Sequence, residues 1–143
     1  MYRFSRRSLK KLEDAHVDLR IILLKAISIS RVDFGISETH RSIKRQQRLF
    51  NEGKSKINGT TTKGKHNYKP SLAVDIYAWI QGKASWDDIH LGYIAGVILT
   101  IADALYDKGE VDHRVRFGGD WDMDGVFVID QNLKDMSHFE LIK

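Results

Sequence analysis

The stretch Leu72-Ala73-Val74-Asp75-Ile76-Tyr77-Ala78-Trp79 decides the fold, because it is a clear strand that carries a charge in an apolar setting. Successive side chains of a strand point to opposite faces of the sheet. One face therefore carries Val74, Ile76 and Ala78, and the other carries Ala73, Asp75, Tyr77 and Trp79. Burying an unpaired carboxylate costs several kcal/mol. Asp75 therefore predicts either a salt bridge to one of the 23 basic residues or a metal ligand, and the spacing leaves both open.

Helical patterns flank this strand on both sides. Apolar residues at spacings of three and four predict one helix that begins after Ser8 and runs to about Ala26. A second helix is expected over residues 42–51, and a third follows a capping box of Ser85 and Asp88 and ends near Asp107. On the first helix His16 is interpreted as a core histidine.

Short extended segments are predicted at residues 32–36, 115–117 and 138–142. Helices and strands mix without the regular alternation of a parallel sheet, so the expected fold class is α+β. With 143 residues, 42% of them hydrophobic, residues 1–143 should form a single domain with one core. His113, between the last long helix and the next strand, is expected in a solvated loop.

Composition excludes several classes of protein. There is no cysteine, which rules out disulfides, thiolate metal sites and a cysteine nucleophile. No apolar run, including residues 21–24, approaches the length of a membrane span, and the basic N-terminus is followed by no signal-peptide core. The net charge of +4 allows attraction to anionic polymers, whether nucleic acid or cell-wall material.

Three segments carry groups suited to metal or acid–base chemistry. His66 lies in a long polar loop over residues 53–71, Asp75 follows in the strand, and Asp135 precedes His138 by three residues. A catalytic zinc ion takes three protein ligands and leaves a position for water, whose proton a separate carboxylate accepts. His66, Asp75 and His138 would suit the ligands and Asp135 the base; the alternative is that His138 simply packs beside Phe139.

These motifs, in this order, resemble the D-Ala-D-Ala carboxypeptidase/VanY-like zinc metallopeptidase family. The likeness is carried by residues 65–76, by Arg116-Phe117-Gly118-Gly119-Asp120-Trp121, by Asp135-Met136-Ser137-His138, and by the segment 37–42. Within the family the chain is similar to the phage L-alanyl-D-glutamate peptidase branch. The resemblance implies a Hedgehog/DD-peptidase-like fold, in which a small antiparallel sheet with flanking helices carries the site.

The resemblance also implies residue roles. His66, Asp75 and His138 would hold Zn²⁺, Asp135 would be the catalytic base, and Arg41 would contact the substrate and stabilise the developing oxyanion. The sequence departs from the family pattern in three places: the interval from His66 to Asp75 is longer, Gly64 replaces a serine, and Thr39-His40 replaces the glycine before Arg41.

Further polar residues are candidates near this site. Asp120, Asp122, Asp124 and Gly125 match the first half of an EF-hand loop, although Gln131 stands where the bidentate glutamate belongs. Related phage enzymes are thought to use calcium here, so a Ca²⁺ site and an ordinary polar turn both stay open. Glu140 is a candidate hydrogen-bond partner for a metal-bound histidine, and His40 a candidate substrate contact.

The resemblance therefore implies a zinc-dependent peptidoglycan peptidase, a phage endolysin that cleaves the L-Ala–D-Glu bond of the stem peptide. The alternatives are a D,D- or L,D-carboxypeptidase on the same site, or a non-enzymatic domain that binds through the basic segments 41–48 and 54–69. The expected partner is the stem peptide and not nucleic acid. The chain should act as a monomer that waits in the host cytoplasm until the membrane is permeabilised.

Overall fold

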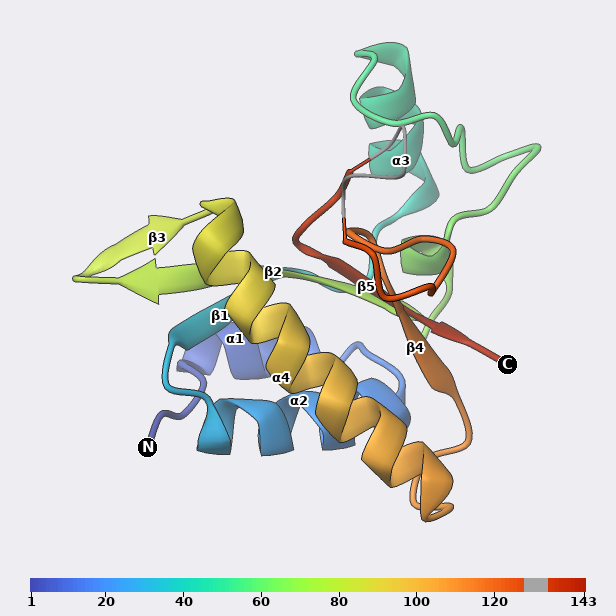
Figure 1. Ribbon diagram of the computed structural model, residues 1–143. Helices are drawn as coiled ribbons and strands as arrows, with labels where there is room; N and C mark the ends of the chain where they lie inside the picture. Colours follow the sequence, from blue (N-terminus) through green and yellow to red (C-terminus); the bar gives the residue numbers. More distant parts are fainter. Residues whose placement is uncertain (128–133) are drawn as a thin grey trace.

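The computed structural model describes residues 1–127 and 134–143 (Figure 1). In chain order the elements are α1 (Arg6–Leu12), α2 (Val17–Ile29), β1 (Asp33–Glu38), α3 (Ile43–Asn51), the 3₁₀ turn η1 (Lys65–Asn67), β2 (Ala73–Ile80), β3 (Lys83–Ser85), α4 (Asp88–Asp107), β4 (Arg114–Phe117) and β5 (His138–Ile142). The expected α+β class and the expected small antiparallel sheet with flanking helices are confirmed.

The sheet has the strand order β1-β2-β5-β4, and β3 pairs with the far end of β2. All the pairings are antiparallel. The register sets Asp75 directly opposite His138 on β5 and opposite Glu38 on β1. An irregularity between Ile36 and Glu38 shifts the β1–β2 register just before this point. Two carboxylates and an imidazole therefore meet near the middle of the sheet.

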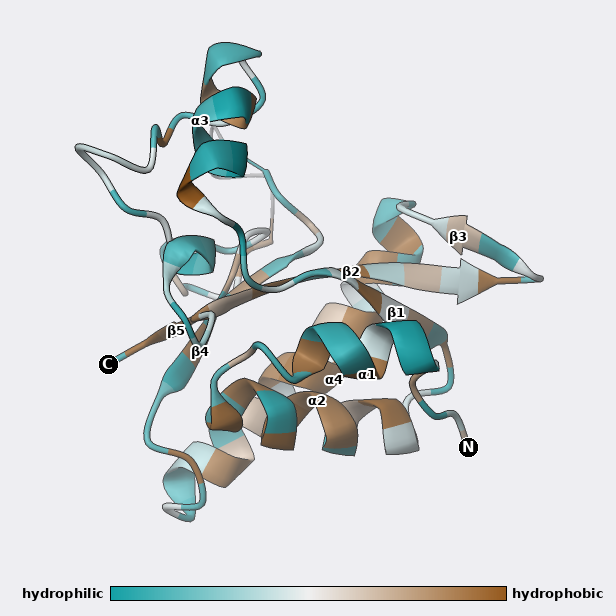
Figure 2. Cartoon of the chain, turned by 180° about the vertical axis from the view of Figure 1, so that it is seen from behind, coloured by the Kyte–Doolittle hydropathy of each residue, from teal (hydrophilic) through white to brown (hydrophobic). Residues whose placement is uncertain are grey.

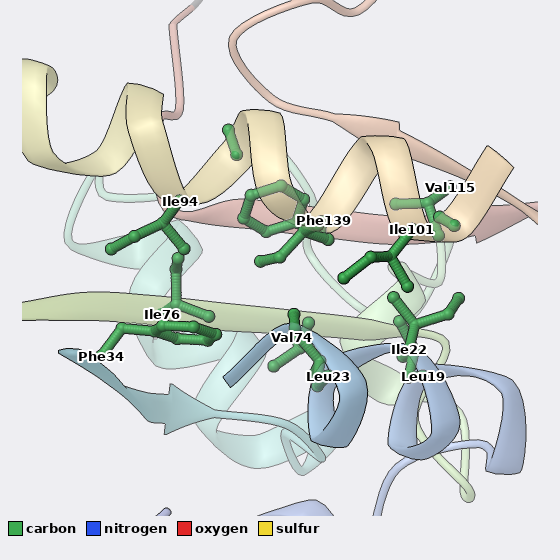
Figure 3. Packing of buried hydrophobic residues seen from close by; sticks show 14 of the residues in the cluster. Leu19, Ile22, Leu23, Phe34, Val74, Ile76, Ile94, Ile101, Val115 and Phe139 are labelled. Atoms are coloured by element: carbon green, nitrogen blue, oxygen red, sulfur yellow. The ribbon is translucent and has the colours of Figure 1, made fainter. Parts of the chain in front are cut away.

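One face of the sheet is closed by helices. Figure 3 shows Val74 and Ile76 of β2 packed among Leu19 and Ile22 of α2 and Ile94 of α4. These side chains are almost completely buried, and full burial of each large aliphatic side chain contributes roughly 1.5–3 kcal/mol. The apolar face expected for β2 is thus the core face, which leaves Asp75 on the opposite side.

The single helix expected from Ser8 to Ala26 is wrong, because the chain forms α1 and α2 with a break between them. At the break the backbone pairs with Ser71: the Ser71 amide donates to the Asp14 carbonyl (2.7 Å), and the His16 amide donates to the Ser71 carbonyl (2.9 Å). These bonds hold the segment in an extended form. The N-cap of α1 is Ser5, while the Ser8 hydroxyl accepts from the Ile36 amide.

His16 and His113 also differ from their interpretations. His16 is the N-cap of α2, where its Nδ1 accepts a hydrogen bond from the Asp18 amide. His113 is not merely solvated, because its Nδ1 donates to Asp18 Oδ2 over 2.8 Å. The same oxygen accepts from the amides of Asp112 and His113, so the buried Asp18 ties α2 to the start of β4.

The start of α4 also differs from the prediction. Its N-cap is Asp87, which accepts from the Ile89 amide, and not a capping box of Ser85 with Asp88. Ser85 instead ends β3, a strand that the sequence analysis missed. Gln81 and Gly82 both have positive φ, the backbone of a two-residue hairpin turn, and so reverse the chain between β2 and β3.

The helix α4 is long and apolar enough, by length and composition, to cross a membrane, although the sequence contains no unbroken apolar run of that length. In this structure seven of its residues, among them Ile94 and Ile98, are buried against the sheet and α2, whereas others such as Ile89 are exposed. Figure 2 shows the contrast with α3, which is largely hydrophilic and stands away from the core.

Candidate active site

Three elements bring the predicted metal ligands together. His66 lies in η1 at the end of the polar loop, Asp75 lies on β2 and His138 opens β5. One ligand atom from each side chain lies within 4.8 Å of the other two. The imidazole centroids of His66 and His138 are 5.2 Å apart. The lengthened His66–Asp75 interval therefore still allows the side chains to converge.

The hydrogen bonds of His66 orient its ring for metal binding. Its Nδ1 lies 2.6 Å from the Thr39 carbonyl oxygen, which can only accept, so Nδ1 carries the proton. Nε2 is then a lone-pair donor, 3.4 Å from Asp75 Oδ1. Within the described residues this buried nitrogen has no hydrogen-bond partner. A buried lone pair without a partner is costly, and a metal ion would satisfy it.

His138 is held in the same manner by Glu140. Its Nε2 is 2.9 Å from Glu140 Oε1, and Arg116 Nη2 donates to the other oxygen of that carboxylate over 2.7 Å. The opposite ring nitrogen, Nδ1, faces Asp75 Oδ1 at 3.1 Å. Glu140 thus has the place expected for the hydrogen-bonded partner of a metal-bound histidine.

The charges of this cluster favour a cation at its centre. Burial by itself would lower the pKa of His138, but hydrogen bonds to Asp75 and Glu140 raise it to about 9. Burial opposes ionisation of Asp75, yet the neighbouring imidazoles hold its pKa well below the usual range. Two nitrogens and one carboxylate oxygen converging in this way form a donor set that suits zinc.

Asp135 lies beside this group, on the turn that enters β5. It lines the same cavity as the three ligand side chains. Its amide donates to the Gly118 carbonyl (3.0 Å), and Ser137 Oγ donates to its Oδ1 (3.1 Å). A Cβ at position 118 would lie 2.2 Å from the Asp135 carbonyl oxygen, so only glycine permits this approach. A carboxylate outside the ligand set but in the same cavity is suited to a general base.

Arg41 also lines this cavity. Its Nη1 donates to Gln46 Oε1 (3.0 Å) and its Nε to Glu38 Oε1 (3.0 Å). Its Nη2 lies 3.7 Å from Asp75 Oδ2. Asp75 therefore forms a salt bridge, as one of the two interpretations required, while its role as a metal ligand stays a prediction. The guanidinium stands between two carboxylates that face each other across β1 and β2 and would otherwise repel.

The surrounding cavity has a volume of about 840 Å³ and a strongly basic wall. That wall comes from α3, the loop after it and the approach to β5, and it carries Arg45, Lys54, Lys56, Lys63, Lys65 and Lys134. Trp121 lines the cavity near His138, with the two rings 5.5 Å apart. His40 does not line the cavity. The basic wall suits an anionic substrate.

The three aspartates of the predicted calcium turn lie together, with ligand oxygens within 4.8 Å of one another. Asp120 is buried and accepts from the amides of Asp124 and Gly125. Burial, followed by the neighbouring carboxylates, raises the pKa of Asp120. Gln131, the substituted position of the loop, lies outside the described residues.

Several groups that orient the site residues were not predicted from the sequence. The Thr39 carbonyl orients His66, Glu38 holds Arg41, and Arg116 holds Glu140. The contacts of Thr39 with His66 and of Arg116 with Glu140 join segments that lie far apart in the sequence, whereas Glu38 and Arg41 are only three residues apart. Only the alternation of His138 and Glu140 along one strand gave a local signal.

Fold and site together define a small α+β protein in which a His–Asp–His group that could hold a metal ion shares one cavity with a further carboxylate, Asp135. The model of the phage L-alanyl-D-glutamate peptidase family matches residues 1–142, and the chain belongs to that family.

Individual relatives agree with this assignment. The chain is 26% identical to the L-alanyl-D-glutamate peptidase of Escherichia phage T5, over 99% of this chain and 98% of that protein. It is also similar to the crystal structure of the Serratia marcescens L-Ala D-Glu endopeptidase ChiX. That match has a TM-score of 0.77 and 30% identity, and it covers 99% of this chain and 90% of ChiX.

Proposed function

We propose that residues 1–143 form one catalytic domain that hydrolyses the L-Ala–D-Glu bond of the peptidoglycan stem peptide with a bound zinc ion. The observation that carries the proposal is the convergence of His66 Nε2, His138 Nδ1 and Asp75 Oδ1 beside Asp135. Mass spectrometry of digested peptidoglycan tests it: new fragments should begin with D-Glu. Release of D-Ala alone would instead support the carboxypeptidase alternative.

The residues of the site have separate roles in the proposed reaction. A zinc ion held by His66, Asp75 and His138 would supply Lewis acidity, which lowers the pKa of a bound water to near 7. Asp135 accepts the proton of the attacking water at its carboxylate and passes it to the leaving amine nitrogen. Arg41 places a fixed positive charge where the carbonyl oxygen becomes an oxyanion. Glu140 keeps the His138 ring oriented through Nε2.

Replacement of Arg41 should slow the chemical step. Arg41→Ala removes a positioned donor, so we expect kcat on peptidoglycan to fall about 10²–10³-fold, the usual effect of losing one oxyanion donor. Zinc content should stay near one per chain. Arg45→Ala is the matched control for kcat: Arg45 also pairs with Glu38 but belongs to the basic cavity wall, so its loss should raise KM and leave kcat close to that of the wild type. A rise in KM with unchanged kcat would show that Arg41 only binds the ground state.

We also propose that Ca²⁺ binds at Asp120, Asp122 and Asp124 and orders the turn beside Gly118 and Asp135. Carboxylates this close repel unless a cation neutralises them, and a ligand that binds only the folded state raises its Tm. Calcium should therefore raise the Tm of the zinc-loaded protein, with affinity in the micromolar to millimolar range. The control is Asp122→Asn with Asp124→Asn. An unchanged Tm up to about 10 mM calcium would contradict this site.

The remaining proposals concern where the enzyme acts. We propose that it works as a monomer on the cell wall, after the host membrane has been permeabilised. The basic residues that line the cavity favour binding of a substrate rich in carboxylates. They also attract the protein to the anionic bacterial cell wall.

A further inference from the structure

The sheet face that carries Asp75 continues beyond the cavity as a strip of aromatic side chains. Asp75, Tyr77 and Trp79 occupy alternate positions of β2, opposite to the buried Val74, Ile76 and Ala78. Trp86, just after β3, joins them: its ring centroid is 5.9 Å from that of Tyr77, which is 6.5 Å from that of Trp79. We call Tyr77, Trp79 and Trp86 the aromatic strip.

The strip is open to solvent. Trp79 is 45% exposed and Trp86 is 58% exposed. Figure 1 shows the β2–β3 hairpin projecting from the body of the molecule, away from α2. Exposed groups of large apolar side chains on soluble proteins commonly mark binding surfaces. None of the three residues has a part in the core cluster.

The neighbouring strand β1 has a glycine, Gly35, where it passes the ring of Tyr77. Gly35 of β1 pairs with Tyr77, and a Cβ at Gly35 would lie 2.4 Å from the Tyr77 hydroxyl oxygen. The tyrosine ring therefore lies across bare backbone. Asp33, which pairs with Trp79, adds a carboxylate on the same face of the sheet. Flat rings bordered by a carboxylate are a common surface for sugars, because rings contact the C–H faces and carboxylates accept from hydroxyls.

We propose that the aromatic strip binds the glycan strand of peptidoglycan, next to the stem peptide held in the cavity. This inference rests on the proposed function. In peptidoglycan, L-Ala is joined to the lactyl group of N-acetylmuramic acid, so a sugar lies one residue from the L-Ala–D-Glu bond. A strand rises about 3.3 Å per residue, which places Tyr77 about 7 Å and Trp79 about 13 Å from Asp75 along β2. That interval suits L-Ala, the lactyl group and a sugar ring.

A protein partner fits the strip less well. Stable interfaces bury about 800 Å² on each partner. An aromatic residue buries at most about 150–250 Å², and the two tryptophans are already about half buried. Three such side chains fall well short of a protein interface but can cover the face of one or two sugars.

Two substrates and one binding measurement test the inference. The substrates are a disaccharide–tetrapeptide muropeptide and the same stem peptide without sugar. For Trp79→Ala and Trp86→Ala, we expect kcat/KM on the muropeptide to fall about tenfold and kcat/KM on the sugar-free peptide to be unchanged. Trp79→Phe keeps a ring and should retain most of the activity. Tyr106→Ala, an exposed aromatic on α4, is the matched control.

The binding measurement is independent of catalysis. The GlcNAc–MurNAc disaccharide, titrated into the wild-type protein, should change the tryptophan fluorescence, and the change should be lost in Trp79→Ala. Equal losses on both substrates, or no fluorescence response to the disaccharide, would overturn the glycan inference. Failure of the wild type to cut either substrate, with the disaccharide still bound, would overturn the proposed function and leave glycan binding intact.

Discussion

The variant His138→Ala is expected to fold but to contain almost no zinc and to show no measurable hydrolysis of peptidoglycan. His138 contributes one of three converging donor atoms, and its loss leaves only His66 and Asp75 to hold the ion. Metal analysis of protein purified without added zinc should show about one zinc per chain in the wild type, the stoichiometry of a single catalytic site. Circular dichroism and Tm should establish that the variant is folded.

The chain contains its own control for this experiment. His16, Asp18 and His113 form another His–Asp–His group whose ligand atoms also lie within 4.8 Å of one another. There, however, Asp18 Oδ2 is already occupied by three donors, and His16 Nδ1 caps α2. His113→Ala should therefore retain zinc. The assignment would be wrong if His113→Ala lost zinc while His138→Ala, His66→Ala and Asp75→Ala kept it. The metal site would then be the group of His16, Asp18 and His113.

Replacement of Asp135 should separate catalysis from metal binding. Asp135→Asn keeps the shape of the side chain and can still accept the hydrogen bond from Ser137, but it cannot take a proton from water. We expect turnover to fall about 10²–10⁴-fold, the scale of a lost general base. Zinc content and Tm should match those of the wild type.

Asp107→Asn is the corresponding control, because Asp107 is an exposed aspartate at the end of α4 and lies outside the cavity. It should leave turnover in zinc-saturated enzyme close to that of the wild type. Wild-type kcat in Asp135→Asn would show that another group accepts the proton. Loss of zinc from Asp135→Asn would make Asp135 a ligand instead.

The parts of the fold that were predictable are those encoded by neighbours in sequence. The alternation of residues 72–79 gave β2 and its buried face, and Ser42 gave the start of α3. The break between α1 and α2 was not predictable, because it depends on bonds from Asp14 and His16 to Ser71. Periodicity does not record such distant pairings.

The site divides in the same way. The order of His66, Asp75, Asp135 and His138 along the chain carried the family resemblance, and the structure brings all four to one cavity. The orientation of these groups could not be predicted. The Thr39 carbonyl orients His66 and Glu140 orients His138. The irregularity after Ile36 brings Glu38 opposite Asp75, with Arg41 between them.

The position of β5 in the sheet implies that the candidate site is among the last parts of the fold to form during synthesis. β5 follows every other described element in the chain, yet it inserts between β2 and β4 and brings His138 to Asp75. A nascent chain that has not yet released this strand from the ribosome lacks both the middle of its sheet and a donor atom. If His138 holds the metal, the site can form only after β5 has left the ribosome, and we expect fragments that end before residue 138 to be inactive.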